Sequence, residues 1–361
     1  MQMPVQQEAM NVDSLTAAPV EIRWHPGLPI YASEEYLKSE AGEYGWVGGR
    51  NTEGSIRCVL PYTVIRKPGF RMIRFQTETL PLGDNFSLEE EKAFLNRVLG
   101  YFQTTDADII IPSGNHAIFR TYPDDALFSP YGTFLNYLDK PEEALMSKIR
   151  KTFRQNIRKA TAAGVQIKTG MEYLEIAYKL VAETLKRSGA KFKGYSEFTK
   201  RIQSLGEHVK VFVAEHEGAI QGCMIAPFSE HTAYNCYAGS RPQPTLGSMH
   251  LLHWEAMRTF RSLGVKRFDF QGVRINPAKG SKQEGIMHYK QGFGGNLVQG
   301  FLWKYPLRPL KSAAYSLAVR LLMGGDIVDQ EQKRIAAGHD GDSAGATASR
   351  NMADPGTSVT R

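Results

Sequence analysis

The chain has 361 residues, of which 42% are hydrophobic, and a formal net charge of +7 from 44 basic and 37 acidic side chains. This length and apolar content exceed what one core comfortably accommodates, so two domains are expected. The basic excess favours an anionic partner such as a phosphate-bearing substrate, RNA or a membrane surface, although a mildly basic surface accounts for it equally well.

The three cysteines, Cys58, Cys223 and Cys236, have no CxxC spacing. This pattern matches neither a disulfide framework nor a zinc site, so we expect a reducing compartment and no metal. The N-terminus lacks the basic-then-apolar order of a signal peptide, and no apolar run approaches the ~18 residues that span a bilayer. The sequence therefore predicts a cytoplasmic protein that is soluble or peripheral at the inner face of the membrane.

Both ends of the chain look unstructured. Residues 1–20 are polar and aperiodic, which predicts a disordered lead. Residues 338–361 are rich in Gly, Ser, Ala and Thr and hold almost no large apolar side chain, so a disordered tail is expected.

The first half predicts a helix, three strands, a helix and a strand. Helical spacing covers 33–38, alternation marks strands at 44–49, 55–66 and 70–78, and a helix at 87–103 leads into a strand at 108–112.

The second half is more legible. The expected order is a strand at 165–168, a helix at 172–187, a second helix capped by Ser196, strands at 209–215, 219–228 and 232–238, a helix at 248–263 that ends at Gly264, a strand at 267–271, a short helical segment towards Lys290 and a last strand near 297–304. Glu217 and Gly218 supply a hairpin turn.

This element order is that of the acetyltransferase (GNAT) fold, and the first half resembles a fainter copy of it. The predicted fold class is α/β with a mixed sheet, built from two tandem GNAT-like domains. We place the N-terminal domain at 21–145 and the catalytic C-terminal domain at 146–305. A C-terminal helix at 306–325 is expected to pack on the body or, less favoured, to lie on a membrane.

Three stretches resemble the Fem family of aminoacyltransferases, which add amino acids to peptidoglycan precursors. They are KIRKTFRQNIRKATAAGVQI (148–167), GSMHLLHWEAMRTFRSLGVKRFDFQGV (247–273) and GIMHYKQGFGGNL (285–297). Their order and spacing also fit, and the resemblance covers roughly 30–305.

The resemblance points to a catalytic lysine. It implies that Lys290 places positive charge where the ester carbonyl develops negative charge during aminolysis. Gly294 and Gly295 would let backbone approach a ligand closely, and Tyr289 and Phe293 would help to bind substrate. A surface lysine at a helix end is the plainer interpretation.

Asp269 lies between two aromatic residues on the strand at 267–271. The resemblance implies a structural or orienting carboxylate. A raised pKa that suits acid or base catalysis is the second interpretation.

Several cations are candidates for phosphate binding. A helix at 142–163 has one apolar stripe and six basic residues on its other faces, Arg154 among them. Arg187, with Lys186 beside it, resembles the position at which the Fem family binds the diphosphate of its precursor. Ordinary solvated cations are the alternative, and we predict that Arg187 and the basic helix face one cleft.

Gly247 and Ser248 open the helix that would receive the acyl donor in the acetyltransferase fold. The loop at 239–249 lacks the glycine-rich spacing of a coenzyme A site and contains two prolines. This departure favours an aminoacyl-tRNA donor over acyl-CoA, without excluding the latter.

Together these features predict an amide-forming acyltransferase with no bound cofactor. Its donor would be an aminoacyl-tRNA and its acceptor an amine of a phosphate-bearing cell-envelope precursor. The alternatives are an acyl-CoA-dependent N-acyltransferase acting on a sugar nucleotide, polysaccharide or amino acid, and a non-catalytic nucleic-acid or envelope-binding protein. The acyl group, the acceptor and the oligomeric state stay open.

Overall fold

The structure, a computed structural model, describes residues 15–337. The first half contains β1 (Thr16–Val20), the short 3-10 helix η2 (Ile30–Ala32), α1 (Glu34–Glu40), β2 (Glu43–Arg50), β3 (Ile56–Lys67), β4 (Phe70–Phe75), β5 (Leu80–Pro81), α2 (Leu88–Gln103), β6 (Ile109–Ile110) and β7 (Leu127–Tyr137).

The second half begins with α3 (Glu142–Lys148), α4 (Lys151–Ala162), β8 (Gln166–Thr169), η3 (Met171–Tyr173), α5 (Leu174–Arg187), α6 (Tyr195–Gln203) and η4 (Gly206–His208). It continues with β9 (Val209–His216), β10 (Ala219–Pro227), β11 (Ala233–Tyr234), β12 (Tyr237–Ser240), α7 (Ser248–Ser262), β13 (Arg267–Asp269), β14 (Val273–Arg274), α8 (Lys282–Gly292), β15 (Asn296–Pro306), α9 (Pro309–Met323) and α10 (Ile327–Ala336).

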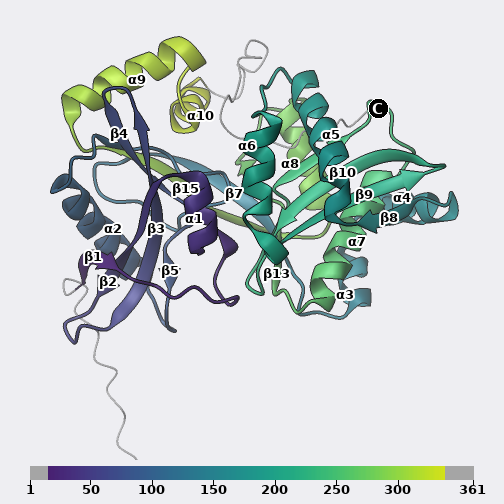
Figure 1. Cartoon of the computed structure of the whole chain (residues 1–361), viewed down its shortest axis with the longest axis horizontal. Helices are drawn as coiled ribbons and strands as arrows, with labels where there is room; N and C mark the ends of the chain where they lie inside the picture. The colour runs from purple at the N-terminus through teal and green to yellow at the C-terminus, as the bar shows by residue number, and fades with distance from the viewer. Residues whose placement is uncertain (1–14, 338–361) are drawn as a thin grey trace, which may run out of the picture.

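One large sheet runs through both halves. It has 11 strands in the order β1-β2-β3-β4-β6-β15-β7-β13-β11, with β5 added to β3 and β14 added to β7. The long strands β7 and β15 pair antiparallel and lie between the two halves (Figure 1), and β15 also pairs with β6. The backbone hydrogen bonds of this sheet therefore join the halves directly.

A second sheet of four strands, in the order β12-β10-β9-β8, belongs to the second half alone. Its two faces bury different helices because alternate side chains point in opposite directions. Val211 and Val213 pack with α5 and α6, whereas Phe212 and Ala214 pack with α4 and α7. Glu217 and Gly218 both have positive φ and form the predicted turn between β9 and β10.

The N-terminal boundary of the fold lies earlier than predicted. Residues 16–20, which we assigned to the disordered lead, form β1 and pair antiparallel with β2 along its whole length. The rest of that lead up to residue 14, and the predicted tail at 338–361, lie outside the described residues.

The sequence analysis missed β7. This strand contains Pro130 and Gly132, both poor strand formers, and yet it pairs with β13, β14 and β15. The domain boundary near residue 145 stays a prediction. It would separate β7 from β13, β14 and β15, the strands with which β7 pairs.

The predicted helix at 142–163 is two helices. The backbone is extended at Ile149 and at Arg150, and the Arg150 amide donates to the Gly292 carbonyl oxygen at 2.9 Å. This contact with α8 replaces a helical hydrogen bond, so tertiary structure interrupts a continuous helical pattern. The helix expected to be capped by Ser196 begins two residues earlier, with Gly194 at its N-cap.

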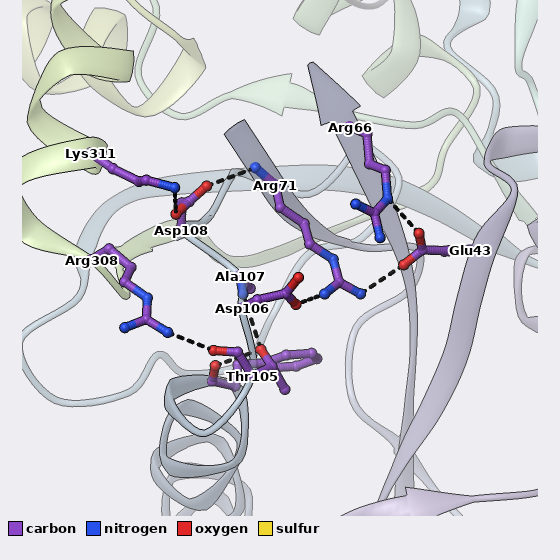
Figure 2. A network of polar contacts seen from close by, with 10 residues as sticks. Glu43, Arg66, Arg71, Thr105, Asp106, Ala107, Asp108, Arg308 and Lys311 are labelled. Atoms are coloured by element: carbon purple, nitrogen blue, oxygen red, sulfur yellow. Dashed lines mark hydrogen bonds and ion pairs between the residues drawn. The ribbon is translucent and has the colours of Figure 1, made fainter. Parts of the chain in front are cut away.

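The helix α9 packs on the first half through a polar network (Figure 2). Asp108 accepts from the Arg71 amide at 2.8 Å and pairs with Lys311 at 3.0 Å. Arg308 donates to the Thr105 carbonyl oxygen at 2.9 Å, and Tyr315 of α9 stacks edge-on against Phe70. These contacts fix the inner side of α9 on the body.

Within residues 15–337, no helix is both long enough and apolar enough to cross a bilayer.

Candidate active site

A cavity of about 300 Å³ lies between the halves, on one face of the large sheet. The strands β7, β11, β13 and β15 form its floor, and their lining side chains point to the same face. The first half supplies its rim, from the segment at 78–81 and the segment at 116–120. The polar and charged side chains that line it are Glu78, Thr79, His116, Arg120, Thr133, Tyr137, His231, Thr232, Tyr234, Arg267 and Asp269.

Asp269 is the one residue predicted from sequence that lines this cavity. Its side chain is buried, and the hydroxyl of Thr133 and the amide of Gln271 both donate hydrogen bonds to its Oδ1, the latter at 2.6 Å. Burial raises the pKa of Asp269 to about 6, against these two hydrogen bonds and the charges of Lys290 and Arg267, which lower it. The pKa of Asp269 therefore lies well above the usual range of an aspartate.

A second carboxyl group, Glu78, reaches the cavity from the first half. Burial in the cavity wall raises the pKa of Glu78 to about 7. The charge of Arg267 lowers this pKa, whereas those of Asp269 and Glu91 raise it. The cavity thus holds two carboxyl groups, one from each half, whose pKa values lie near those suited to proton transfer at neutral pH.

Two neutral histidines complete the cavity wall. Arg267 Nη2 lies 2.5 Å from His231 Nε2, and burial together with the charge of Arg267 lowers the pKa of His231 to about 3. His116 Nε2 donates to the Gln76 carbonyl oxygen at 3.0 Å, and burial lowers the pKa of His116 to about 3 as well. Neither imidazole carries a charge at neutral pH, so Arg267 is the strongest positive charge on the floor of the cavity.

Lys290 lies behind the floor of the cavity and not in its lining. It is 3% exposed, and its ammonium donates to the carbonyl oxygens of Gln271 at 3.1 Å and Gly272 at 2.6 Å. Gln271 has a φ of 56°, which is uncommon for a residue with a side chain. Lys290 therefore holds the turn that follows Asp269, and its charge lowers the pKa of that carboxyl group. The plainer interpretation, a surface lysine, is wrong.

The aromatic residues beside Lys290 belong to the core. Phe293 is fully buried against Phe153 and Phe270, so the prediction that it contacts substrate is wrong in this arrangement. Tyr289 is buried too, with its hydroxyl 3.3 Å from His253 Nδ1. Both side chains lie on the face of the large sheet opposite to the cavity, with Phe134, Phe268 and Phe270.

The glycines near Lys290 allow other parts of the chain, and not a ligand, to pack closely against the backbone. Gly294 has a φ of 76°, and a Cβ atom there would lie 2.6 Å from the carbonyl oxygen of Lys148. A Cβ atom on Gly295 would lie 2.7 Å from Asn136 Oδ1. We expected the backbone at these glycines to approach a ligand. At Gly294 it instead approaches the end of α3, at the break between α3 and α4.

The predicted shared cleft of Arg187 and the basic helix is absent from the described residues. Arg187 ends α5, which packs on one face of the small sheet, and α4 packs with α7 on the other face. Arg187 Nη2 donates to the Ser240 carbonyl oxygen at 2.6 Å and to Thr184 Oγ1 at 2.9 Å, while Lys186 beside it is exposed. Arg187 therefore ties α5 to the end of β12 and presents the rest of its guanidinium at the surface.

Arg154 has a structural partner of its own. Its Nη1 donates to the carbonyl oxygens of Ser147 at 2.9 Å and Ile149 at 2.6 Å, which satisfies the C-terminal end of α3. Arg154 also lines a shallow hollow with Arg158 and Trp254.

The start of α7 is covered by α4. Gly247, with a φ of 84°, is the N-cap of α7, and a Cβ atom on it would lie 2.1 Å from the Asn156 carbonyl oxygen. Ser248 is fully buried and donates its hydroxyl to the Thr245 carbonyl oxygen at 2.6 Å. This arrangement leaves no space for a pyrophosphate at the helix terminus unless α4 moves.

The cavity also contains residues that sequence reasoning missed. Thr133 belongs to the unpredicted strand β7, and Glu78 follows β4 in a short segment with no recognisable motif. The alternation in LFSPYGTFLNY was the available signal for Thr133. No local pattern marks Glu78, because its partners lie about 190 residues away in the chain.

Residues 147–291 match the family of acetyltransferase (GNAT) domains. The protein is an acyltransferase. This match runs from the end of α3 to α8 and includes Asp269 and Lys290.

The solved structure of FemX has the same fold as this chain. It superposes with a TM-score of 0.60 at 15% identity, over 84% of this chain and 96% of FemX, and so confirms at the level of the fold both the resemblance to the Fem family and the two GNAT-like halves. The C-terminal domain (DUF2156) of a putative lysylphosphatidylglycerol synthetase from Agrobacterium fabrum matches with 13% identity, over 79% of this chain and 91% of its own, at a TM-score of 0.48. No curated protein sequence matches the chain.

Proposed function

We propose that this acyltransferase forms an amide bond, passing an aminoacyl group from aminoacyl-tRNA to an amine of a peptidoglycan precursor or another cell-envelope molecule. The observation that carries the proposal is the cavity between the halves, where Asp269 titrates near neutral pH beside Arg267. A polar cavity with a carboxyl group of this kind suits an amine that must lose a proton before it attacks an ester.

The chemistry requires two kinds of help. The acceptor amine has to be oriented and deprotonated, and the oxygen of the attacked carbonyl gains negative charge as the C–N bond forms. Asp269 lies where the first kind of help is needed. Lys290 and Arg267 place positive charge on the two sides of Asp269 and keep a proportion of it ionised at neutral pH.

The fold specifies the acyl donor less closely than any other part of the proposal. Acyl-CoA is the second candidate, since the second half matches an acetyltransferase domain. The packing of α4 over the start of α7 favours aminoacyl-tRNA instead, because Gly247 and Ser248 are buried where a coenzyme A pyrophosphate would need free amides.

The acceptor would bring a phosphate group to the exposed guanidinium of Arg187. Two of its donor contacts already fix its position, at Ser240 and Thr184, so it meets a diphosphate in a defined orientation. Lys186 adds a second cation at the same helix end. A precursor anchored in this way could extend its amine towards the cavity.

A membrane surface is the proposed location of the reaction. The outer side of α9 exposes Leu310, Leu317, Leu321 and Leu322, and Leu310 is 89% exposed. Lys311 and Arg320 flank these leucines and are more than half exposed. Exposed leucines bordered by cations suit the headgroup region of an anionic bilayer, where a lipid-linked acceptor would be found.

Donor profiling tests this function. The purified protein is incubated with pools of charged tRNA or, separately, with acyl-CoAs, in the presence of peptidoglycan precursors that carry a free amine. Mass spectrometry then identifies the products. We expect the precursor to gain the mass of an aminoacyl group when charged tRNA is the donor and not when acyl-CoA is the donor. Products formed only with acyl-CoA would establish the second candidate.

A further inference from the structure

The first half contributes one carboxyl group, Glu78, to the lining of the cavity that also contains Asp269. Glu78 lies in the segment between β4 and β5, and Thr133 of β7 and Asp269 of β13 line the same cavity. Arg267, in the same cavity, acts electrostatically on both Glu78 and Asp269. The two carboxyl groups therefore share one cavity while coming from different halves of the molecule.

We infer that Glu78 is the catalytic base that takes the proton from the acceptor amine, and that the complete site is assembled only where the first half closes over the second. This inference rests on the proposed acyl transfer. It adds a catalytic residue outside the matched acetyltransferase domain, which begins at residue 147.

The surroundings of each carboxyl group indicate its role in the reaction. Asp269 Oδ1 already accepts from Thr133 and Gln271, which fixes that group and favours its ionised form. It is suited to holding the positively charged ammonium of the acceptor. Burial raises the pKa of Glu78 to about 7, so this carboxyl group is suited to taking up a proton near neutral pH.

The surroundings of Glu78 set its pH dependence. Arg267 opposes protonation of Glu78, while Asp269 and Glu91 favour it. The two histidines of the cavity are neutral at the relevant pH, and Arg120 is engaged with Glu91, its Nε lying 2.5 Å from Glu91 Oε2. The titratable and charged groups around Glu78 are thus Asp269, Arg267, His231, His116, Arg120, Glu91, Tyr137 and Tyr234.

The reaction balances in protons and bonds. The acceptor enters as R–NH3+ and gives one proton to the Glu78 carboxylate. The free amine attacks the carbonyl carbon of the donor ester, so that a C–N bond forms and the C–O bond to the terminal ribose breaks. A second amine proton goes to the departing ribose oxygen, the third stays on the amide nitrogen, and Glu78 returns its proton to water.

The test compares Glu78→Gln with wild type in the aminoacyl transfer assay, across pH 5.5 to about 9. Wild-type kcat/KM should rise with pH through about 7, the pKa of Glu78. The Gln variant should lose on the order of a hundredfold in kcat/KM at neutral pH and should lose that limb of the profile. Glu78→Asp, which keeps a carboxylate, should retain the limb with reduced activity.

Two controls separate a base from a structural residue. Glu53→Gln removes an exposed charge from the turn between β2 and β3, and should leave the profile unchanged. Hydroxylamine, a nucleophile that is uncharged at neutral pH, should restore much of the lost rate in Glu78→Gln, because it needs no base to become reactive. The thermal midpoint of Glu78→Gln at pH 8 should be no lower than that of wild type, since the substitution removes a half-buried charge.

The outcomes are distinct. No product from wild-type protein with any donor would refute the proposed function itself. An active wild type together with an unchanged pH profile in Glu78→Gln would refute the role of Glu78 alone. Failure of hydroxylamine to restore the rate, with a lowered thermal midpoint, would also overturn it and assign Glu78 to the structure of the cavity rim.

Discussion

At the scale of single residues, Lys290 joins structure to chemistry. Its ammonium satisfies two buried carbonyl oxygens, and its charge lowers the pKa of Asp269. We predict that Lys290→Met reduces turnover on the order of a hundredfold and raises the pKa of Asp269, so that any part of the pH profile that depends on Asp269 moves upward. The same variant should lose about 2 kcal/mol or more of unfolding free energy, because two buried acceptors lose their donor.

The measurement for Lys290 is a pH–rate profile together with chemical denaturation. Lys282→Met, on the exposed start of the same helix, is the matched control and should change neither quantity. A Lys290→Met protein with full turnover would show that the lysine is dispensable for the reaction. A loss of stability with an unmoved profile would limit it to a structural role.

Asp269 makes the stability of the protein depend on pH. Its pKa is raised from 3.8 to about 6, so its favourable contribution is complete below about pH 4 and is lost as the pH rises through about 6. We predict that Asp269→Asn removes a decrease of about 2 kcal/mol in unfolding free energy between pH 4.5 and pH 7. Denaturation at pH 4.5 and pH 7 measures it, and Asp84→Asn, at an exposed position, should keep the wild-type slope.

At the scale of elements, the break between α3 and α4 depends on Gly294. A Cβ atom there would lie 2.6 Å from the Lys148 carbonyl oxygen, whereas one on Gly264, with nearly the same φ, would have nothing within 4 Å. We predict that Gly294→Ala destabilises the protein clearly more than Gly264→Ala, which should cost about 1 kcal/mol for its left-handed backbone alone. Equal thermal midpoints for the two variants would contradict this packing.

The helix α9 offers a second test at this scale. Because Leu317 and Leu321 are exposed, we predict that replacing both with Ser leaves the thermal midpoint within a degree or so of wild type. The double variant should nevertheless lose sedimentation with vesicles that contain anionic phosphatidylglycerol. Tyr315→Ser, which removes the contact of α9 with Phe70, is the contrasting variant and should lower the midpoint. If the wild-type protein does not sediment with such vesicles, membrane contact is no longer part of the proposal.

At the scale of the whole molecule, the two halves are joined by more than a linker. The strands β6, β15 and β7 are contiguous in one sheet, and the core around α5 and α6 includes Tyr31, Tyr36 and Leu37 from the first half. Arg201 of α6 pairs with Glu40 of α1 at 2.7 Å, and Gln271 Nε2 donates to the Tyr31 hydroxyl at 3.0 Å. The halves therefore share both a sheet and a core.

We predict from this arrangement a single unfolding transition in differential scanning calorimetry, with coincident loss of near- and far-ultraviolet circular dichroism. Arg201→Ala should lower the midpoint of that transition without splitting it. Two resolved transitions would mean that the halves unfold independently, and that the site between them opens before the cores melt.

By itself the sequence determined most of the local elements and their order. Alternation at 209–215 and 219–228, the Glu217–Gly218 turn and the helical spacing at 248–263 each reflect which side chains are buried along a short stretch, and each element formed within a few residues of its expected bounds. That order was enough to indicate the fold, and the motif around Asp269 was enough to mark one residue of the cavity. Local periodicity records burial, and burial of one face is what fixes a helix or a strand.

Only the tertiary structure decided which distant elements meet. It made a strand of 127–137 despite Pro130 and Gly132, because partners on both sides satisfy its backbone. It broke the helix at Arg150 because Gly292 offers an acceptor there. It placed Glu78 in one cavity with Asp269, although no pattern connects them in the chain, since the pKa of a carboxyl group depends on the solvent and charges around it in the folded protein and not on its neighbours in sequence.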